Sequence, residues 1–178
     1  MHGLIKNFAS NFTINDIKNE IKLRQNYITV NNIVIKEERL TCWMSDSNYE
    51  YKYGNKIMEP DILSYNIKKI QKLILDNYGY YYDSVLINYY ENGTVGMRYH
   101  SDNIYDEWNE DTVVVSFGSS RKVIFREIDN YDNKIYYNID NGDLLYMKEK
   151  CQERYQHKVA KDKNIKDERI SLVFKSHI

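Results

Sequence analysis

The chain contains few residues that impose structure by themselves. Among its 178 residues are one proline, two cysteines and seven glycines. Cys42 and Cys151 lie far apart and belong to no C-x-x-C motif, so they indicate neither a zinc site nor a disulfide framework. Both are expected to be reduced thiols, which is typical of a reducing compartment.

Long apolar runs and a signal sequence are also lacking. No stretch approaches the roughly 18 apolar residues that a transmembrane helix needs. The first residues, MHGLIKNFASNF, do not show the charged-then-apolar pattern of a signal peptide. We therefore expect an intracellular protein, cytoplasmic or nuclear, with no membrane partner. The net charge of -1 gives no overall support for a nucleic-acid partner, although a local basic surface could provide it.

The composition is typical of a globular protein with one core. The chain is 29% charged and 42% hydrophobic, which is ordinary for a soluble domain. At this length, and without repeats, linkers or shifts in composition, we expect a single domain over residues 1–178. Residues 1–80 are expected to form a helical and nucleotide-lid portion, and residues 81–178 the core.

Two segments show the residue spacing of helices. Residues 15–25 carry isoleucines four positions apart, with Thr13 or Asn15 as the expected cap. Residues 60–78 begin with a proline, which suits a first helical turn, and repeat leucine and isoleucine along one face. Both segments are expected to be helices that pack on the core.

Beyond residue 79 the pattern changes to short apolar runs separated by turn residues such as Asn92-Gly93 and Asn141-Gly142. This alternation indicates antiparallel strands. The strands are expected at residues 85–90, 94–100, 112–117, 122–128, 134–139 and 144–147, in a short piece around residue 157, and at residues 169–175. Two helices in front of eight strands predict an α+β fold, with a double-stranded β-helix (jelly roll) core on which the N-terminal helices pack.

A metal site is indicated by His100, Asp102 and His157. Side chains two residues apart lie on the same side of an extended chain, so the H-x-D motif presents an imidazole and a carboxylate together. A later histidine can complete the facial triad of non-haem Fe(II) oxygenases, which leaves coordination positions open for substrate and O2. An H-x-D motif alone is common and most histidines bind no metal, so the spacing does not establish the site.

The strand at residues 169–175 adds a cation to this hypothesis. Alternation places Arg169, Ser171, Val173 and Lys175 on one face, with the intervening apolar residues on the other. The planar fork of arginine matches a carboxylate in two hydrogen bonds, so Arg169 is the better clamp for an acidic co-substrate. Arg169 and Lys175 would lie roughly 20 Å apart on a straight strand, so both reach one small dicarboxylate only if the strand curls. Without the triad, these would be two charges facing water.

Two further features are less specific. Asn88 and Tyr90 lie two residues apart on a predicted strand, and both could hydrogen-bond a co-substrate from one face. The segment 148–163 holds six lysines or arginines against three acidic residues. It brackets His157 and would place positive charge beside the metal, although a charge run is more often a solvated loop.

Several short motifs follow one another between residues 39 and 175. They are Arg39-Leu40-Thr41-Cys42-Trp43, Tyr51-Lys52-Tyr53-Gly54, Met58-Glu59-Pro60, Asn88-Tyr89-Tyr90, His100-Ser101-Asp102, Ser116-Phe117-Gly118, His157, and Arg169 with Ser171-Leu172-Val173-Phe174. In content and order they resemble the AlkB-type Fe(II)/2-oxoglutarate dioxygenases, which remove alkyl groups from nucleobases. The H-x-D…H set is shared by many 2-oxoglutarate oxygenases, whereas the first motifs and the N-x-Y are more particular to the AlkB type.

The resemblance implies a cofactor set and a role for each motif. His100, Asp102 and His157 would bind Fe(II), with 2-oxoglutarate and O2 as co-substrates and with ascorbate supporting activity. Arg169 would bind the far carboxylate of 2-oxoglutarate. The rest of its pocket would be formed by Asn88, Tyr90, Ser171 and Lys175. Lys175 stands where the family usually has a second arginine, and Ser171 is shorter than the asparagine often found there, so a weaker affinity for the co-substrate is expected.

The same resemblance assigns the substrate side of the site. Trp43 and Tyr53 resemble a base-handling lid, in which an aromatic ring holds an extruded base against His100. The implied reaction is oxidative demethylation of bases of the 1-methyladenine and 3-methylcytosine type in DNA or RNA, releasing formaldehyde, succinate and CO2. The expected partner is nucleic acid, in single-stranded regions, and the protein is expected to act as a monomer.

Two other functions remain open from the sequence. The same Fe(II)/2-oxoglutarate chemistry could act on a protein side chain, as in prolyl and lysyl hydroxylases. The fold could also have been kept as a binding module without turnover, but the complete triad together with Arg169 argues against this. The aromatic lid residues and the basic segment favour nucleic acid. Residues 103–111, directly after the H-x-D, could form a substrate loop.

Overall fold

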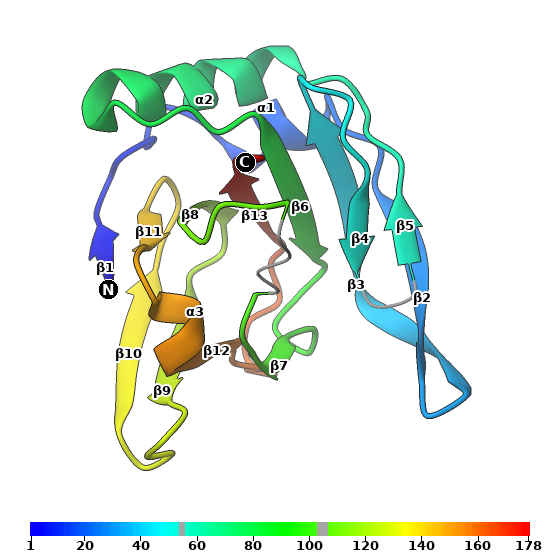
Figure 1. Ribbon diagram of the computed structural model, residues 1–178, viewed down its shortest axis with the longest axis vertical. Coiled ribbons are helices and arrows are strands. Elements are labelled where there is room, and N and C mark those ends of the chain that lie inside the picture. Colours follow the sequence, from blue (N-terminus) through cyan, green and yellow to red (C-terminus); the bar gives the residue numbers. More distant parts are fainter. Residues whose placement is uncertain (54–55, 103–106) are drawn as a thin grey trace.

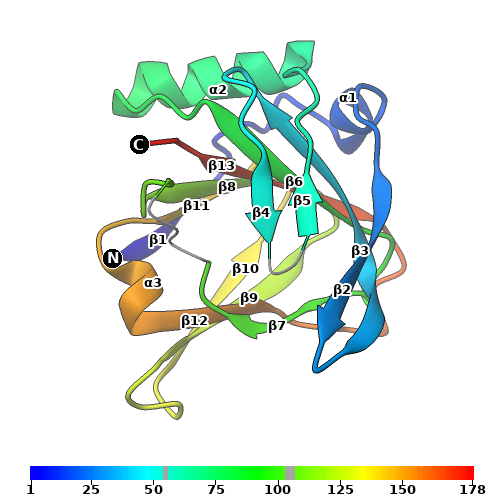
Figure 2. The same cartoon turned by 45° about the vertical axis from the view of Figure 1, so that its right-hand side comes forward.

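The chain forms two facing antiparallel sheets, with helices on the outer side of the larger sheet (Figures 1 and 2). The computed structural model describes residues 1–53, 56–102 and 107–178. The elements in these ranges are β1 (His2–Ile5), α1 (Ile14–Lys18), β2 (Arg24–Val30), β3 (Ile33–Ser45), β4 (Tyr51–Tyr53), β5 (Lys56–Met58), α2 (Tyr65–Tyr78), β6 (Ser84–Tyr90), β7 (Met97–His100), β8 (Thr112–Gly118), β9 (Arg121–Glu127), β10 (Lys134–Ile139), β11 (Leu144–Met147), α3 (Cys151–Arg154), β12 (Tyr155–Val159) and β13 (Arg169–Lys175).

The larger sheet has seven strands in the order β1-β11-β8-β13-β6-β3-β2, and the smaller sheet has four in the order β10-β9-β12-β7. Strands β4 and β5 form a separate hairpin. Strand β13 lies between β8 and β6, so that Ser171 is opposite Ser116 on one side and Asn88 on the other. The predicted α+β jelly roll is confirmed, with two facing sheets that do not close into a barrel.

The outer face of the larger sheet is covered by α2 (Figure 1). Its residues Ile67, Ile70 and Ile74 are buried against apolar residues of β6, β8 and β13. Gly79 ends the helix in the left-handed region, with φ of 67°, and donates its N–H to the carbonyl of Leu75. Burial of this face fixes the larger sheet from behind, which leaves its other face free to line a cavity. Within the described ranges, no helix is long and apolar enough to cross a membrane.

Both predicted helices are shorter in the structure. Helix α1 begins with the expected Thr13 cap, in a capping box with Asp16, but ends at Lys18. From Arg24 onward the chain pairs with β3, so strand hydrogen bonds replace helical ones. Residues 60–64 are not helical, because the backbone of Asp61 bonds to β3 at both its N–H and its carbonyl.

The eight strands predicted beyond residue 79 are all present, with ends that differ by at most a few residues. Five strands before residue 79 were not predicted, so residues 1–80 contain more strand than helix. The reason is clearest in the β2–β3 hairpin, where Tyr27, Ile33 and Val34 are all exposed. A ribbon exposed on both faces has no alternation of buried and exposed residues for the sequence to reveal.

Candidate active site

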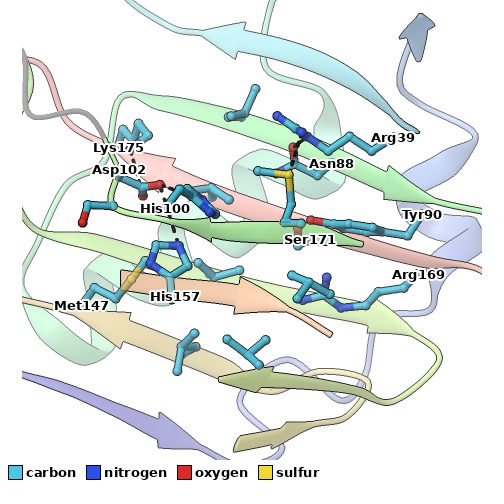
Figure 3. Close-up of a pocket in the computed structure, with 18 of the residues that line it drawn as sticks. Arg39, Asn88, Tyr90, His100, Asp102, Met147, His157, Arg169, Ser171 and Lys175 are labelled. Carbon is cyan, nitrogen blue, oxygen red and sulfur yellow. Dashed lines mark hydrogen bonds and ion pairs between the residues drawn. The ribbon is translucent and has the colours of Figure 1, made fainter. Parts of the chain in front are cut away.

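The two interior histidines and Asp102 meet at one end of a cavity (Figure 3). His100 lies at the end of β7, and the pairing of β7 with β12 places His157 directly opposite it. One ligand atom from each of the three residues lies within 4.8 Å of the other two. The Nε2 atoms of His100 and His157 are 3.6 and 3.8 Å from Oδ1 of Asp102. The structure therefore brings the predicted triad together in an arrangement that could bind one metal ion and leave positions open.

Two hydrogen bonds orient the triad. Nδ1 of His100 donates to the carbonyl of Arg98 at 2.8 Å, which leaves the lone pair of Nε2 facing Asp102. The backbone N–H of Asp102 donates to Oε1 of Gln152 at 2.9 Å. Gln152 comes from α3, directly before the strand that carries His157, so one short helix supports both the carboxylate and the second histidine.

Burial and nearby charges keep Asp102 and His157 in the protonation states that bind metal. Desolvation lowers the pKa of His157 to about 3, and the neighbouring His100 and Lys175 act in the same direction. Burial alone would raise the pKa of Asp102, but the charge of Lys175, with His157 and His100, holds it below its usual range. At neutral pH His157 is therefore a neutral imidazole and Asp102 a carboxylate, so metal need not displace a proton from either.

The metal-free protein is expected to lose stability as the pH falls below about 6.5. In the unfolded chain His157 takes up a proton near its ordinary pKa of 6.5, whereas in the folded protein it stays neutral to about 3. The unfolded state therefore binds more protons in this window, and the free energy of unfolding should fall by on the order of 3 kcal/mol between pH 7 and 4.5. Urea unfolding in EDTA at the two pH values measures this loss.

The variant His157→Gln is the control for this effect. It cannot take up a proton, so most of the loss between pH 7 and 4.5 should disappear. A variant that loses as much stability as the original protein would show that other groups cause the pH dependence.

The triad shares its cavity, of about 350 Å³, with Arg169 (Figure 3). This volume suits a small molecule. The cavity is lined from both sheets, and Arg169 lies away from the triad, near the other end of β13 from Lys175. The residues of β13 that line it are Arg169, Ser171, Val173 and Lys175. The intervening Ile170, Leu172 and Phe174 are buried in the core beneath α2, so the predicted division of this strand into two faces is confirmed.

Arg169 is a buried cation with unused hydrogen-bond donors. Its side chain is 1% exposed, and its Nη2 donates to Oγ of Ser116 at 2.9 Å. Its guanidinium also lies over the ring of Tyr90, at 5.2 Å. Its Nε and Nη1 are buried without a hydrogen-bond partner among the described residues. Buried donors are normally satisfied, and a guanidinium matches a carboxylate in two parallel bonds, so this site fits the carboxylate of a small acid.

The other residues predicted for the co-substrate lie on the same wall. Asn88 and Tyr90 line the cavity from β6, next to Ser171 and Arg169 of β13. Lys175 is at the metal end, where its Nζ lies 3.4 Å from Oδ2 of Asp102. It is 3% exposed, so its charge is held beside that of the carboxylate. The strand thus carries one cation for each end of the cavity, instead of two cations on one carboxylate.

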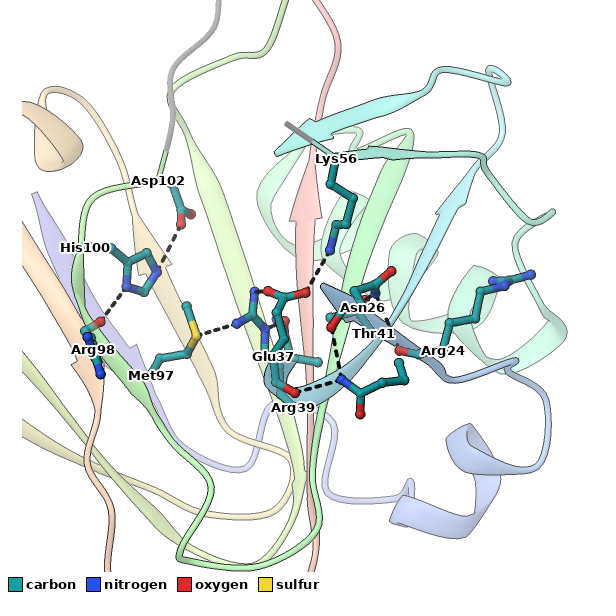
Figure 4. Close-up of polar contacts among 12 residues, drawn as sticks. Arg24, Asn26, Glu37, Arg39, Thr41, Lys56, Met97, Arg98, His100 and Asp102 are labelled. Atoms are coloured by element: carbon teal, nitrogen blue, oxygen red, sulfur yellow. Dashed lines mark hydrogen bonds and ion pairs between the residues drawn. The ribbon is translucent and has the colours of Figure 1, made fainter. Parts of the chain in front are cut away.

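Arg39 lines the cavity, although no specific role in the site was predicted for it. From β3 its Nε donates to Oδ1 of Asn88 at 2.7 Å and its Nη1 lies 2.7 Å from Sδ of Met97 (Figure 4). Its Nη2 is 3.1 Å from Glu37, which in turn pairs with Lys56 of β5 at 2.9 Å. Arg39 therefore links both sheets with the β4–β5 hairpin beside the cavity. Its place in the R-L-T-x-W motif was the available signal, but β3 was not predicted as a strand.

Of the two residues predicted for the lid, Trp43 is buried in the core, and the side chain of Tyr53 lies outside what the structure describes. Trp43 is fully buried and is not among the cavity-lining residues, because the ring of Tyr51 stacks on it at 4.6 Å. Tyr51, from β4, lines the cavity in its place. Tyr53 belongs to β4, but its side chain lies outside what the structure describes. An aromatic wall is present, but it is Tyr51 that faces the cavity.

The predicted substrate loop at residues 103–111 is only partly described. Residues 103–106 lie outside the described ranges. Trp108 packs edge-on against Trp43, with ring centroids 5.3 Å apart, and forms an isolated bridge with His177. This part of the segment therefore supports the same buried aromatic cluster as Tyr51.

Comparisons with known proteins agree with this geometry. The family model described as "2OG-Fe(II) oxygenase superfamily" matches residues 1–175. The chain belongs to this superfamily. Its cofactors are therefore Fe(II) and 2-oxoglutarate, with O2 as co-substrate, and a His-Asp-His group suited to the metal is present in the described residues.

Individual relatives place the chain within the superfamily. It is 32% identical over 151 residues to "Uncharacterized protein R406" of Acanthamoeba polyphaga mimivirus, covering 84% of this chain and 78% of that protein. It is 26% identical over 154 residues to human "Alpha-ketoglutarate-dependent dioxygenase alkB homolog 3", covering 81% of this chain and 53% of the human protein. The chain thus spans about half the length of the homolog 3 proteins that it matches.

A solved structure supports the same placement at the level of the fold. The structure of OsALKBH1 superposes with a TM-score of 0.71 and 13% sequence identity, covering 98% of this chain and 97% of that chain. Together these matches identify an AlkB-type 2-oxoglutarate oxygenase, an oxidoreductase.

Proposed function

We propose that this oxygenase removes N-linked methyl groups from nucleobases of the 1-methyladenine and 3-methylcytosine type in DNA or RNA. The observation that carries the proposal is one cavity that holds both the His-Asp-His group and Arg169, whose Nε and Nη1 have no hydrogen-bond partner among the described residues. Tyr51 supplies an aromatic wall and Arg39 a polar one. With the AlkB-type relationship, these walls favour a base over a protein side chain as the group that is oxidised.

His100, Asp102 and His157 would hold Fe(II). With 2-oxoglutarate and O2, the bound metal would supply hydroxylation of the N-methyl group, with succinate and CO2 as co-products and formaldehyde lost from the adduct. The task of the protein is then to place the methyl group at the metal and to exclude side reactions. Neutral His157 and ionised Asp102 suit this role, because both offer lone pairs at neutral pH.

Arg169 would bind the far carboxylate of 2-oxoglutarate through its unused Nε and Nη1 donors. Tyr90 and Ser171, which lie beside it on the same wall, would complete that end of the pocket together with Asn88. Lys175 would act at the metal end, where its charge compensates that of Asp102 and favours the ionised carboxylate. A lysine can serve there because a single charge, not a two-pronged fork, is required.

Replacing Tyr51 with leucine is expected to lower kcat/KM for a methylated oligonucleotide by roughly 5- to 150-fold, the value of one base–aromatic stack. Decarboxylation of 2-oxoglutarate without substrate should fall much less, because the stack holds only the base. Formaldehyde from the oligonucleotide and succinate from the uncoupled reaction are measured on the same samples.

The variant Trp43→Ala is the structural comparison for Tyr51. Because Trp43 is fully buried, its removal should cost about 3–5 kcal/mol of stability and lower both activities together. If Tyr51→Leu also lowered both activities equally, Tyr51 would be part of the core and not a base platform.

The test of the proposed function is mass spectrometry of methylated single-stranded DNA and RNA oligonucleotides after incubation with the protein, Fe(II), 2-oxoglutarate, ascorbate and O2. Loss of one methylene mass that depends on 2-oxoglutarate is the expected result, and the substrate that changes distinguishes DNA from RNA. Succinate without any change in the oligonucleotides would contradict the proposal and direct the search to protein side chains as substrates.

A further inference from the structure

The outer face of the smaller sheet concentrates positive charge and tyrosine. On β9 and β12, Phe125 and His157 point toward the core and the cavity, so the alternate residues point outward. The outward residues of β9, β10 and β12 include Lys122, Arg126, Lys134, Tyr136, Gln156 and Lys158. None of the outward positions on these three strands holds an acidic residue.

Arg126 is held between two aromatic rings on this face. Its guanidinium lies 3.9 Å from the ring of Tyr99 and 3.9 Å from that of Tyr131. Its Nε and Nη2 donate to Oε1 of Gln156 at 3.0 and 2.6 Å. An arginine has five N–H donors, so Nη1 and one N–H of Nη2 are not used by any described contact. The group is therefore rigid and still able to bind an anion.

Within the described part of the chain, the lysines of this face do not form the ion pairs that several other lysines form. Among the described residues, Lys6, Lys18 and Lys161 each pair with a carboxylate at 2.5 or 2.6 Å. No carboxylate in the described part of the chain pairs with Arg126 or with the three lysines at residues 122, 134 and 158. In a chain whose net charge is -1, this is a local excess of like charge that a polyanion would neutralise.

We propose that this outer face binds the single-stranded flank of a nucleic-acid substrate. The identity of the strand rests on the proposed function, whereas the surface itself rests on charge and aromatic content. The four cations would contact phosphates, and Tyr136, which is 58% exposed, would stack on a base between them. A polyanion without bases would contact the cations but would not stack on Tyr136. Substitution of Tyr136 therefore distinguishes a nucleic-acid strand from a polyanion without bases.

The surface is continuous with the cavity across one strand. Strand β7 is one of the two edge strands of the smaller sheet, and its His100 lines the cavity while the adjoining Tyr99 contacts Arg126 on the outer face. Arg126 is on β9, two strands from this edge, which corresponds to about 10 Å at the usual strand spacing. A chain whose base reaches the metal centre would cross β7 to meet Lys158 on β12, and then β12 to meet Lys122 and Arg126 on β9.

The first test is the binding of unmodified, fluorescein-labelled single-stranded DNA, measured by anisotropy at several salt concentrations. In the double variant Lys122→Glu/Lys158→Glu the Kd should rise roughly tenfold or more, and the salt dependence should flatten by about 0.7 for each lost phosphate contact. The variant Tyr136→Ala keeps the charge and should raise the Kd roughly fivefold.

The matched control is Lys69→Glu/Lys72→Glu on α2, which makes the same change of charge on the far side of the molecule (Figure 1). Its Kd should not change. An equal loss in the control, or no loss at Lys122 and Lys158, would overturn the proposal. A loss at the lysines with none at Tyr136→Ala would assign the face to a polyanion without bases, such as an acidic protein. Thermal unfolding shows that each variant is folded.

Turnover separates this proposal from the proposed function. A methylated nucleoside has no flanking phosphates that could reach the outer face, so only a long methylated strand should lose kcat/KM in the lysine double variant. If the unaltered protein demethylates neither substrate, the proposed function fails, and the anisotropy result still decides the surface. If it demethylates both and the lysine variant matches it on both, the surface proposal alone fails.

Discussion

Replacement of Asp102 by alanine is expected to lower the turnover of 2-oxoglutarate by about three orders of magnitude. A metal ion contributes several kcal/mol to a reaction of this kind, and each 1.4 kcal/mol corresponds to about a tenfold change in rate. Asp102 is the only carboxylate of the triad, and its removal leaves two imidazoles and the uncompensated charge of Lys175. Succinate formation, measured with and without substrate, gives the loss.

The control for Asp102 is Glu153→Ala, which removes one exposed carboxylate from the neighbouring helix α3. This variant changes the charge near the site but removes no metal ligand, so it should retain turnover. Retention of turnover in Asp102→Ala would contradict the assignment of the triad, since the same cavity would then be active without a carboxylate at the metal.

Replacement of Arg169 by leucine is expected to raise the KM for 2-oxoglutarate roughly 100-fold or more, as is usual when one partner of a buried charge pair is removed. The variant Arg169→Lys keeps the charge and loses the planar fork of the guanidinium. Its KM for 2-oxoglutarate should therefore lie between that of the original protein and that of Arg169→Leu. Steady-state succinate formation at increasing 2-oxoglutarate concentrations measures both. An unchanged KM in Arg169→Leu would place the carboxylate elsewhere in the cavity.

Protein stability distinguishes a binding role of Arg169 from a structural one. Two of its nitrogens have no partner in the described part of the chain, so its charge is buried without compensation when no acid is bound. Removing such a charge should leave the stability of the 2-oxoglutarate-free protein unchanged or increase it. Added 2-oxoglutarate should raise the Tm of the original protein but not that of Arg169→Leu. A structural arginine would give the opposite pattern, with a large loss of stability and an unchanged response to 2-oxoglutarate.

The strands after residue 79 and the triad could be predicted because their signals are local. Each of these strands is a short apolar run between turn residues, and His100 and Asp102 are related by the two-residue period of an extended chain. The same period predicted which face of β13 lines the cavity. His157 was supplied by elimination, as the remaining interior histidine, and the pairing of β7 with β12 places it opposite His100.

The features that were missed depend on contacts between distant segments. Helix α1 ends early because the chain after it pairs with β3, and residues 60–64 are not helical because Asp61 bonds to β3. The sequence did not reveal β3 as a strand. Trp43 was expected at the cavity. The strand alternation of the sequence cannot reveal that the ring of Tyr51, from another strand, covers Trp43. The sequence shows how far Lys175 is from Arg169 along the strand. That Lys175 pairs with Asp102 follows only from the folded structure.

Base demethylation is tested most directly by the ratio of formaldehyde to succinate formed on a single-stranded oligonucleotide that carries one 1-methyladenine. One formaldehyde is expected for each succinate, and a much slower release of succinate with the same oligonucleotide lacking the methyl group. Succinate released at the same rate on both strands, without formaldehyde, would contradict base demethylation, because the oxidation would then not be directed at the base.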